Sequence, residues 1–304
     1  MIFGEKNMCT ENEKLSLIIS REDVFSSRYF DYQKSDKYIY YNKHNEQIEV
    51  GVYTHYLSAT STDIAIDLST MIGCPMKCLF CQSASVNYER NLSSDEIAVI
   101  AKRIIKNHIH KNTKQITCSL QGIGEPSLIP ETVIDLYQQL INYDKRVKYS
   151  ISTIGASIDG LNKIINSGIK IDNLQITKCG TTNIVEKELT PNGISIAKLS
   201  ELIKEIIKRH NIKKAKLNYI LIKGKTDSKE DLQNLIAIFK NRGIAIKISY
   251  LNETECSTKY GLLPTSYNEA ILFSSELQEN GIDSYVFGSF KNIAISCGQL
   301  LTKK

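Results

Sequence analysis

The sequence predicts an α/β fold, a partial (β/α)6 barrel of the TIM type that carries a small N-terminal β cap. Strand-like and helix-like segments alternate from about residue 63 onward, and repeated β-α units with short loops imply a parallel sheet with right-handed crossovers. About six such units follow a tight group of cysteines, and a functional site in this fold lies at the C-terminal ends of the strands. The preceding residues are polar and rich in tyrosine, unlike the rest of the chain.

The cap is predicted to cover residues 1–60 and the barrel residues 61–304. Two strand-like runs at 37–41 and 47–53 flank a turn-like segment, which is the pattern of a β-hairpin. The region holds too few apolar residues to form a core of its own. We therefore expect a cap on the barrel, not an independent domain.

The barrel elements follow from hydrophobic periodicity. Ile64, Ile66 and Leu68 alternate with smaller or polar residues, as in a strand. A capping box at 93–96 opens a helix whose isoleucines 97, 100, 104, 105 and 109 form one apolar stripe. The same reasoning predicts strands at 115–120, 147–152, 173–177, 215–222, 245–251 and near 284–287, and helices at 130–143, 157–166, 196–210, 228–241 and 266–281.

Composition excludes several classes of protein. With 42% hydrophobic and 23% charged residues, the chain of 304 residues is neither disordered nor collagen-like. Its apolar runs are much shorter than the roughly 20 residues that span a bilayer, and residues 1–6 do not resemble a secretory signal. We expect a soluble, cytoplasmic monomer without a membrane partner. The net charge of +5 permits a nucleic-acid partner without requiring one.

Three of the eight cysteines, Cys74, Cys78 and Cys81, fall within eight residues in the spacing C-x3-C-x2-C, directly after a strand. Three thiolates on one short loop can hold three irons of a [4Fe–4S] cube and leave the fourth iron open to another ligand. A structural zinc site would require a fourth cysteine or histidine nearby, and His55 and His108 are not at zinc-ligand spacing. The spacing therefore favours an iron–sulfur cluster.

This cysteine spacing, with Phe80 before the last cysteine, resembles the radical S-adenosylmethionine (SAM) superfamily. In that superfamily SAM chelates the open iron, and the reduced cluster cleaves SAM to a 5′-deoxyadenosyl radical. The segment Gly122-Ile123-Gly124-Glu125-Pro126 is a weak motif alone. Placed one β-α unit after the cysteines, it resembles the segment that receives the SAM amino group, where Gly124 leaves space and Glu125 meets the ammonium.

Several blocks, in order, resemble the RlmN/Cfr family, which methylates carbon 2 or carbon 8 of an RNA adenine. They are residues 69–74, 90–92, 122–126, 150–155 and the C-terminal Cys297-Gly298-Gln299-Leu300. The resemblance implies that Cys297 receives the methyl group first. The alternative for Cys297 is a buried small hydrophobic residue.

The resemblance also implies roles for single residues. Ser152 and Asn252 are similar to SAM-binding residues of the family, and Thr177 retains a SAM contact, although Cys179 stands where the family has a histidine. Glu49 resembles the glutamate that removes the adenine proton. The alternative for Glu49 is an ordinary exposed glutamate on a strand.

Two departures from the family matter. Asp67 stands where the family has a second cysteine, and a carboxylate cannot perform thiol–disulfide exchange. We expect Asp67 to supply an acid/base or substrate contact, with Cys179 as the nearest replacement thiol. We also expect the family's helical accessory domain for RNA to be missing, with only the β cap before the barrel. A basic segment at 204–216 either contacts phosphates or is a solvated helix face.

Together these features predict a [4Fe–4S]-dependent radical SAM enzyme, a methyltransferase that acts on an RNA adenine through methylated Cys297. The resemblance implies an external electron donor such as flavodoxin or ferredoxin. A peptide or small-molecule substrate in a biosynthetic pathway is the alternative. A degenerate, non-catalytic binding protein is disfavoured by the intact cysteine and Gly-Glu motifs.

Overall fold

The computed structural model describes residues 18–30, 33–58 and 60–287, and their strands form one ten-stranded sheet. The sheet begins with three antiparallel strands, β1 (Arg21–Phe30), β2 (Gln33–Tyr41) and β3 (Gln47–Ser58). The next strand, β4 (Ser61–Leu68), pairs antiparallel with β3 on one side and parallel with β7 on the other. β4 is therefore the strand at which the sheet changes from antiparallel to parallel.

The remaining strands are parallel and follow one another in chain order. They are β7 (Thr113–Leu120), β8 (Val147–Thr153), β9 (Asn173–Lys178), β10 (Ala215–Leu221), β11 (Ala245–Tyr250) and β12 (Ser284–Phe287). Within the described residues β1 and β12 are the two edges of the sheet and do not pair with each other. The predicted α/β fold, with a curved and mostly parallel sheet, is confirmed.

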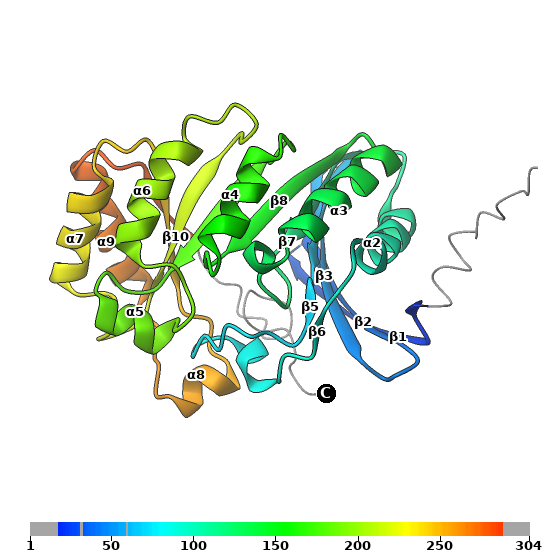
Figure 1. The fold of residues 1–304 in the computed structure, drawn as a ribbon, viewed down its shortest axis with the longest axis horizontal. Coiled ribbons are helices and arrows are strands. Elements are labelled where there is room, and N and C mark those ends of the chain that lie inside the picture. Colours follow the sequence, from blue (N-terminus) through cyan, green and yellow to red (C-terminus); the bar gives the residue numbers. More distant parts are fainter. Residues whose placement is uncertain (1–17, 31–32, 59, 288–304) are drawn as a thin grey trace, which may run out of the picture.

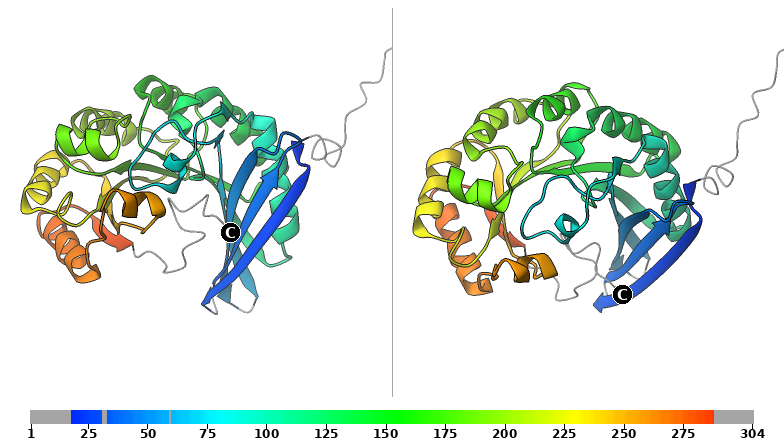
Figure 2. Two further views of the ribbon diagram at one scale, coloured as in Figure 1. Left: turned by 90° about the horizontal axis from the view of Figure 1, so that it is seen from below. Right: turned by 60° about the horizontal axis from the view of Figure 1, so that its bottom comes forward.

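Helices cover the outer face of this sheet, and Figure 2 shows them as an arc around it. Each lies between consecutive parallel strands, as right-handed crossovers require. They are α2 (Ser94–His108), α3 (Pro130–Tyr143), α4 (Ile158–Asn166), α6 (Ile196–Ile206), α7 (Lys229–Phe239) and α9 (Tyr267–Glu279) (Figure 1). Among the described residues, no helix has the length and apolar character needed to cross a membrane.

The hydrophobic core lies between the helices and the sheet. Ile64, Ile66 and Leu68 of β4 are fully buried in it, as their alternation predicts. The same cluster contains Val50 and Val52 of β3 and the isoleucines of α2. Because side chains alternate along a strand, the opposite face of the sheet points to the inside of the curve, and that face is polar.

Several short elements are absent from the predictions. The edge strand β1 extends the predicted hairpin, and two short helices, α5 (Asn183–Leu189) and α8 (Glu255–Lys259), interrupt connections that were expected to be loops. The predicted helix 196–210 ends at Ile206. The division of the chain at residue 60 stays a prediction, although β3 and β4 form a continuous ladder across it.

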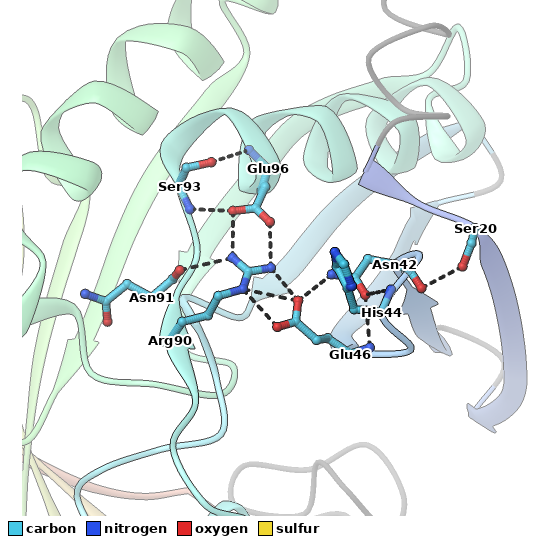
Figure 3. A network of polar contacts seen from close by, with 8 residues as sticks. All are labelled: Ser20, Asn42, His44, Glu46, Arg90, Asn91, Ser93 and Glu96. Atoms are coloured by element: carbon cyan, nitrogen blue, oxygen red, sulfur yellow. Dashed lines mark hydrogen bonds and ion pairs between the residues drawn. The ribbon is translucent and has the colours of Figure 1, made fainter.

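A polar network ties the N-terminal strands to the first helix (Figure 3). The guanidinium of Arg90, on β6 (Arg90–Asn91), contacts Glu46 at 2.6 Å and Glu96 at 2.9 Å. Glu46 lies in the turn between β2 and β3, and Glu96 completes the capping box with Ser93 at the start of α2. Arg90 thereby connects the hairpin to the helix that covers it.

Candidate active site

A cavity of about 440 Å³ lies on the inner face of the sheet. Its wall includes the cysteine loop, the residues that follow β7 and β11, and inward-facing residues of most strands. The strand residues alternate with core residues, so the strands contribute polar side chains to a wall that also holds apolar residues of the loops. They include Tyr53, Asp67, Ser152, Gln175, Thr177, Asn218, Lys247 and Ser249.

The structure brings all three cysteines of the triplet to this cavity. Cys74 and Cys78 are buried and Cys81 is half-buried. The loop leaves β5 (Met71–Ile72) through Gly73, whose φ of 67° and close approach to the carbonyl oxygen of Asn87 leave no room for a Cβ atom. Within the described ranges, no set of three Cys, His, Asp or Glu side chains is arranged around a single metal ion.

Two of the unpredicted helices hold the cysteine loop. The amide of Leu79 donates to the carbonyl oxygen of Leu189 at the end of α5, at 3.0 Å. The hydroxyl of Thr254, which caps α8, donates to the carbonyl oxygen of Phe80 at 3.1 Å. The backbone of the loop is thus held by hydrogen bonds to two distant parts of the chain.

Burial in this apolar surrounding raises the pKa of the Cys74 thiol to about 11, and it raises the pKa of Cys78 and of Cys81 as well. The three thiols are therefore protonated at neutral pH in the absence of a metal. Metal binding must release these protons, because the thiolate is the ligand.

Glu125 is buried at the cavity wall and ties the loop after β7 to the end of β8. Its carboxylate accepts hydrogen bonds from the amides of Ser127 and Ile154, each at 3.0 Å, and from the hydroxyl of Thr153. Burial raises its pKa, and these hydrogen bonds oppose that rise. Gly124 has a φ of 118°, and a Cβ atom there would collide with the hydroxyl of Thr70. The Gly-Glu segment therefore depends on glycine for its shape.

The other predicted SAM contacts, Ser152, Thr177 and Asn252, also line the cavity. The hydroxyl of Ser152 donates to the side-chain oxygen of Gln121 at 3.0 Å. The polar residues Gln121, Gln175 and Lys247 are on the same wall and were not predicted. Their positions in the sequence could have identified them, because each is a polar residue in or directly after a predicted strand.

Asp67 lines the same cavity as the cysteines. Burial raises the pKa of its carboxyl to about 7, while a hydrogen bond from Tyr53 and the positive charge of Lys247 act in the opposite direction. A carboxyl group with this pKa can both accept and donate a proton near neutral pH. Its place on the inner face agrees with the alternation along β4.

Glu49 lies outside the wall of this cavity. Its carboxylate is 2.7 Å from the ammonium of Lys37, and both side chains are almost completely buried. The alternative reading, an exposed strand glutamate, is therefore wrong. The proposed role of Glu49 as the base stays a prediction, and the ion pair with Lys37 is its observed contact.

Two predictions concern other cysteines. Cys179, the suggested replacement thiol, is fully buried in an apolar cluster behind the cysteine loop and does not line the cavity, and burial raises its pKa strongly. That environment disfavours a thiolate, so Cys179 does not fit the role of an exchanging thiol. Cys297 lies outside the described residues.

The basic segment at 204–216 lies before β10, at the end of the sheet where the parallel strands begin. The cysteine loop is at the other end. Lys204 and Lys208 form ion pairs with Glu201 and Glu205, each three residues earlier in the chain, at 2.6 and 3.3 Å. These contacts agree with a solvated face and place the segment away from the cavity.

Comparisons with known proteins agree with this geometry. The family model described as "Radical SAM superfamily" matches residues 68–236. A relative from Petrotoga mobilis, named "Probable dual-specificity RNA methyltransferase RlmN", is 29% identical over 245 residues, covering 78% of this chain and 67% of the relative. A protein of the same name from Pseudothermotoga lettingae is 28% identical over 286 residues, covering 91% of this chain and 78% of that protein.

Among solved structures, a radical SAM methyltransferase from Sphaerobacter thermophilus has a similar fold, with a TM-score of 0.76. The two proteins are 19% identical, and the match covers 91% of this chain and 81% of the other. The likeness extends beyond the parallel strands to the N-terminal part of the described chain. With its cysteine loop at the cavity wall and a family match over more than half of its length, this chain belongs to the radical SAM superfamily and is an enzyme related to the RlmN-like methyltransferases.

Proposed function

We propose that this enzyme binds a [4Fe–4S] cluster and SAM in the inner cavity and transfers a methyl group. The observation that carries the proposal is the convergence of Cys74, Cys78, Cys81 and Glu125 on one cavity. Three thiolates on one short loop can each bind one iron of a cube. When bound, the cluster supplies the electron that cleaves SAM.

The residues that line the cavity would bind different parts of SAM and limit the access of water. Glu125 holds carboxylate oxygens at the wall, where they can meet the ammonium of SAM. Ser152, Thr177 and Asn252 lie within the same wall and offer polar groups to the remainder of SAM. The apolar packing around the cysteine loop, with Met76 and Ile123, limits the access of water to the thiols.

For the acceptor, we propose an RNA adenine that is methylated through Cys297. The names of the relatives support RNA methylation, and the adenine and the cysteine carrier are what the family resemblance of the sequence implies. Phe287 lines the cavity, and Cys297 follows ten residues later in the sequence. An extended chain advances at most about 3.3–3.6 Å per residue, so a separation of ten residues is compatible with this role. Asp67 is the group we assign to proton transfer on the substrate, because its pKa lies near neutral pH.

A peptide or small-molecule acceptor is the second candidate, and one observation favours it. Among the described cysteines, only those of the triplet line the cavity, and Asp67 stands where the related enzymes have a second cysteine. The release of a cysteine–RNA adduct by thiol exchange therefore lacks a thiol at this wall. A substrate that forms no such adduct avoids the difficulty.

Anaerobic reconstitution tests the cofactor part of the proposal. The enzyme should bind about four irons per chain, as one cube requires, and release 5′-deoxyadenosine from SAM with a flavodoxin, ferredoxin or chemical electron donor. Cys78→Ala should lose both the iron and the cleavage. Cys118→Ala, in the core behind the sheet, is the matched control and should retain both. A protein that binds only zinc and does not cleave SAM would contradict the proposal.

The acceptor is tested with methyl-labelled SAM. Label counted separately in RNA, protein and small-molecule fractions distinguishes the two candidates. Intact-mass analysis should also find one added methyl group on the Cys297 peptide, absent in Cys297→Ala. An unmodified Cys297 with undiminished turnover in Cys297→Ala would contradict the carrier role.

A further inference from the structure

The turn between the first two cysteines of the triplet, residues 75–79, has a backbone conformation that needs support. Lys77, at the centre of this turn, has a φ of 55°, a left-handed conformation that is uncommon for a residue with a long side chain. Such a conformation persists where contacts from the surrounding chain stabilise it. Because Lys77 directly precedes Cys78, the conformation of the turn determines where the Cys78 thiol lies.

A segment from a distant part of the chain contacts both ends of this turn. We call residues 186–196 the clamp segment; it begins in α5 and ends at the start of α6. The carbonyl oxygen of its Leu189 accepts a hydrogen bond from the amide of Leu79 at 3.0 Å. The side-chain amide of its Asn192 donates to the carbonyl oxygen of Pro75 at 3.2 Å. The clamp segment therefore holds the turn at its first and last residues.

Glu186 holds the two ends of the clamp segment together. Its carboxylate accepts hydrogen bonds from the amide of Ile196, the first residue of α6, at 2.9 and 3.2 Å. Its carbonyl oxygen accepts hydrogen bonds from the amide and the hydroxyl of Thr190, at 2.8 and 3.1 Å. The shape of the clamp segment thus depends on the position of this one glutamate.

A buried lysine holds Glu186 in place. The ammonium of Lys178, the last residue of β9, lies 2.5 Å from the carboxylate of Glu186, and the two side chains are 1% and 6% exposed. The same ammonium donates to the carbonyl oxygen of Ile194, within the clamp segment. Because both charges are removed from water, the loss of one would leave the other buried without compensation.

The clamp segment also contacts the chain directly after β8. The amide of Ile194 donates to the carbonyl oxygen of Ile154 at 3.2 Å, and a Cβ atom at Gly155 would collide with the Ile194 side chain. The amide of Ile154 donates in turn to the carboxylate of Glu125 at 3.0 Å. One buried ion pair therefore fixes a segment that contacts both the cysteine loop and the neighbour of Glu125.

We propose that Lys178 and Glu186 are positioning residues for the iron–sulfur cluster. Through the clamp segment they hold the cysteine loop in its cluster-binding conformation before the cluster binds. This inference rests on the proposed function of the cavity. Neither residue lines the cavity, so both act through the loop and not by contact with SAM or the acceptor. The hydrogen bonds and the solvent exposure around the cluster sulfurs depend on this loop, and they set the reduction potential.

Hydrogen–deuterium exchange of the cluster-free protein tests this role without any activity of the loaded enzyme. The double variant Lys178→Met/Glu186→Gln removes both charges, while the new side-chain oxygen can still accept from the amide of Ile196. The amide of Leu79 should exchange about tenfold faster than in wild type, which corresponds to a loss of about 1.4 kcal/mol in its opening free energy. Amides in β7 should change less than about threefold, because a neutral pair of similar volume leaves the overall stability almost unchanged.

The reduction potential of the reconstituted cluster is the second measurement. The double variant should shift the midpoint potential relative to wild type, because the loop around the cluster sulfurs is no longer held. A role in stability alone would lower the iron content or the melting temperature without changing the potential of the clusters that form.

Lys225→Met is the matched control. It breaks the ion pair of Lys225 with Glu188, on the same helix α5, at 2.7 Å, where both side chains are 41% exposed. It should leave both the exchange of the Leu79 amide and the reduction potential unchanged, because an exposed ion pair contributes little. Lys178→Met alone leaves a buried carboxylate without its partner and should accelerate the exchange further, and the double variant serves if this single variant does not fold.

Unchanged exchange of the Leu79 amide in the double variant would overturn the inference and leave the proposed function intact. Equal acceleration in β7 would also overturn it, because the ion pair would then act on the stability of the whole fold. Faster exchange of Leu79 together with an unchanged potential would overturn the role toward the cluster. A wild-type protein that takes up no iron would overturn the proposed function and the inference together.

Discussion

Asp67 illustrates how a single residue acquires a chemical property from its position in the fold. On β4 it alternates with core residues and therefore faces the cavity, where burial raises its pKa to about 7. Tyr53 donates a hydrogen bond to it, and Tyr53 has room beside Gly51 because glycine has no side chain. The carboxyl group is thus held near the midpoint of its titration at neutral pH.

This pKa has a consequence for stability. An unfolded aspartate has a pKa of about 3.9, so between pH 4 and 7 the folded protein binds more protons than the unfolded chain. Asp67 therefore reduces stability progressively as the pH rises through this window. In Asp67→Asn the free energy of unfolding should exceed that of wild type by about 1–2 kcal/mol at pH 8, a figure reduced for the partial solvation of the cavity.

Denaturant unfolding of both proteins at pH 4, 6 and 8 measures this difference. The two stabilities should converge toward pH 4, where the aspartate is protonated in the folded state. A difference that did not vary with pH would mean that the substitution acts through packing and not through the charge of Asp67.

At the scale of elements, the join between the N-terminal strands and helix α2 depends on Arg90 (Figure 3). Arg90 contacts two carboxylates from different elements, Glu46 in the hairpin turn and Glu96 in the first turn of α2. Its hydrogen bonds lower the pKa of Glu46. Forked contacts of arginine with carboxylates are the stronger kind of ion pair, although this side chain is partly exposed.

We expect Arg90→Met to reduce the free energy of unfolding by about 1–2 kcal/mol, and less in high salt. Because the pKa of Glu46 is lowered, this contribution is present above pH 4 and is lost as the pH falls further. Arg103→Met is the matched control, since the ion pair of Arg103 in the described chain involves one carboxylate, that of Glu22, at 2.8 Å. It should cost less than about 1 kcal/mol. If both variants lost the same free energy of unfolding, the contacts of Arg90 with two carboxylates would contribute no more than a single surface ion pair.

At the scale of the whole molecule, the N-terminal strands belong to the same sheet as the parallel strands. β3 pairs with β4 from Val50 to Ser58, and Ile48, Val50 and Val52 lie in the same core as helix α2. Because this ladder joins the N-terminal strands to the parallel strands, unfolding of one set removes hydrogen bonds from the other. A cap that unfolded alone would expose both the ladder of β4 and the apolar face of α2.

We therefore expect one cooperative unfolding unit from β2 to β11. Hydrogen–deuterium exchange should give amides in β2 and β3 the same free energy of opening as amides in β7 and β8. β1, at the edge of the sheet, is the internal reference and should exchange faster. Exchange of β2 and β3 at much lower free energy would show that residues before β4 form a separate unit.

The sequence alone determined most of the regular fold and the cysteine site. Period-2 alternation indicates a strand with one face on a core, and a period of 3.6 residues indicates a helix with one face on a core. These patterns were sufficient to predict β4 and α3, because both elements are long and regular. The cysteine spacing was sufficient to predict that the three cysteines meet, because they lie within eight residues of one another. The short helices α5 and α8 could not be predicted in this way, since they are stabilised by contacts with the cysteine loop.

Only the tertiary structure decided which polar residues meet. It paired Glu49 with Lys37, buried Cys179 away from the cavity, and brought Gln121 and Lys247 into one hydrogen-bonded row. Gln121 and Lys247 are far apart in the sequence and meet through the order of the strands, whereas Lys37 and Glu49 meet through the register of β2 against β3. A local pattern determines the face on which a side chain lies, whereas its partner on that face is determined by the packing of the whole chain.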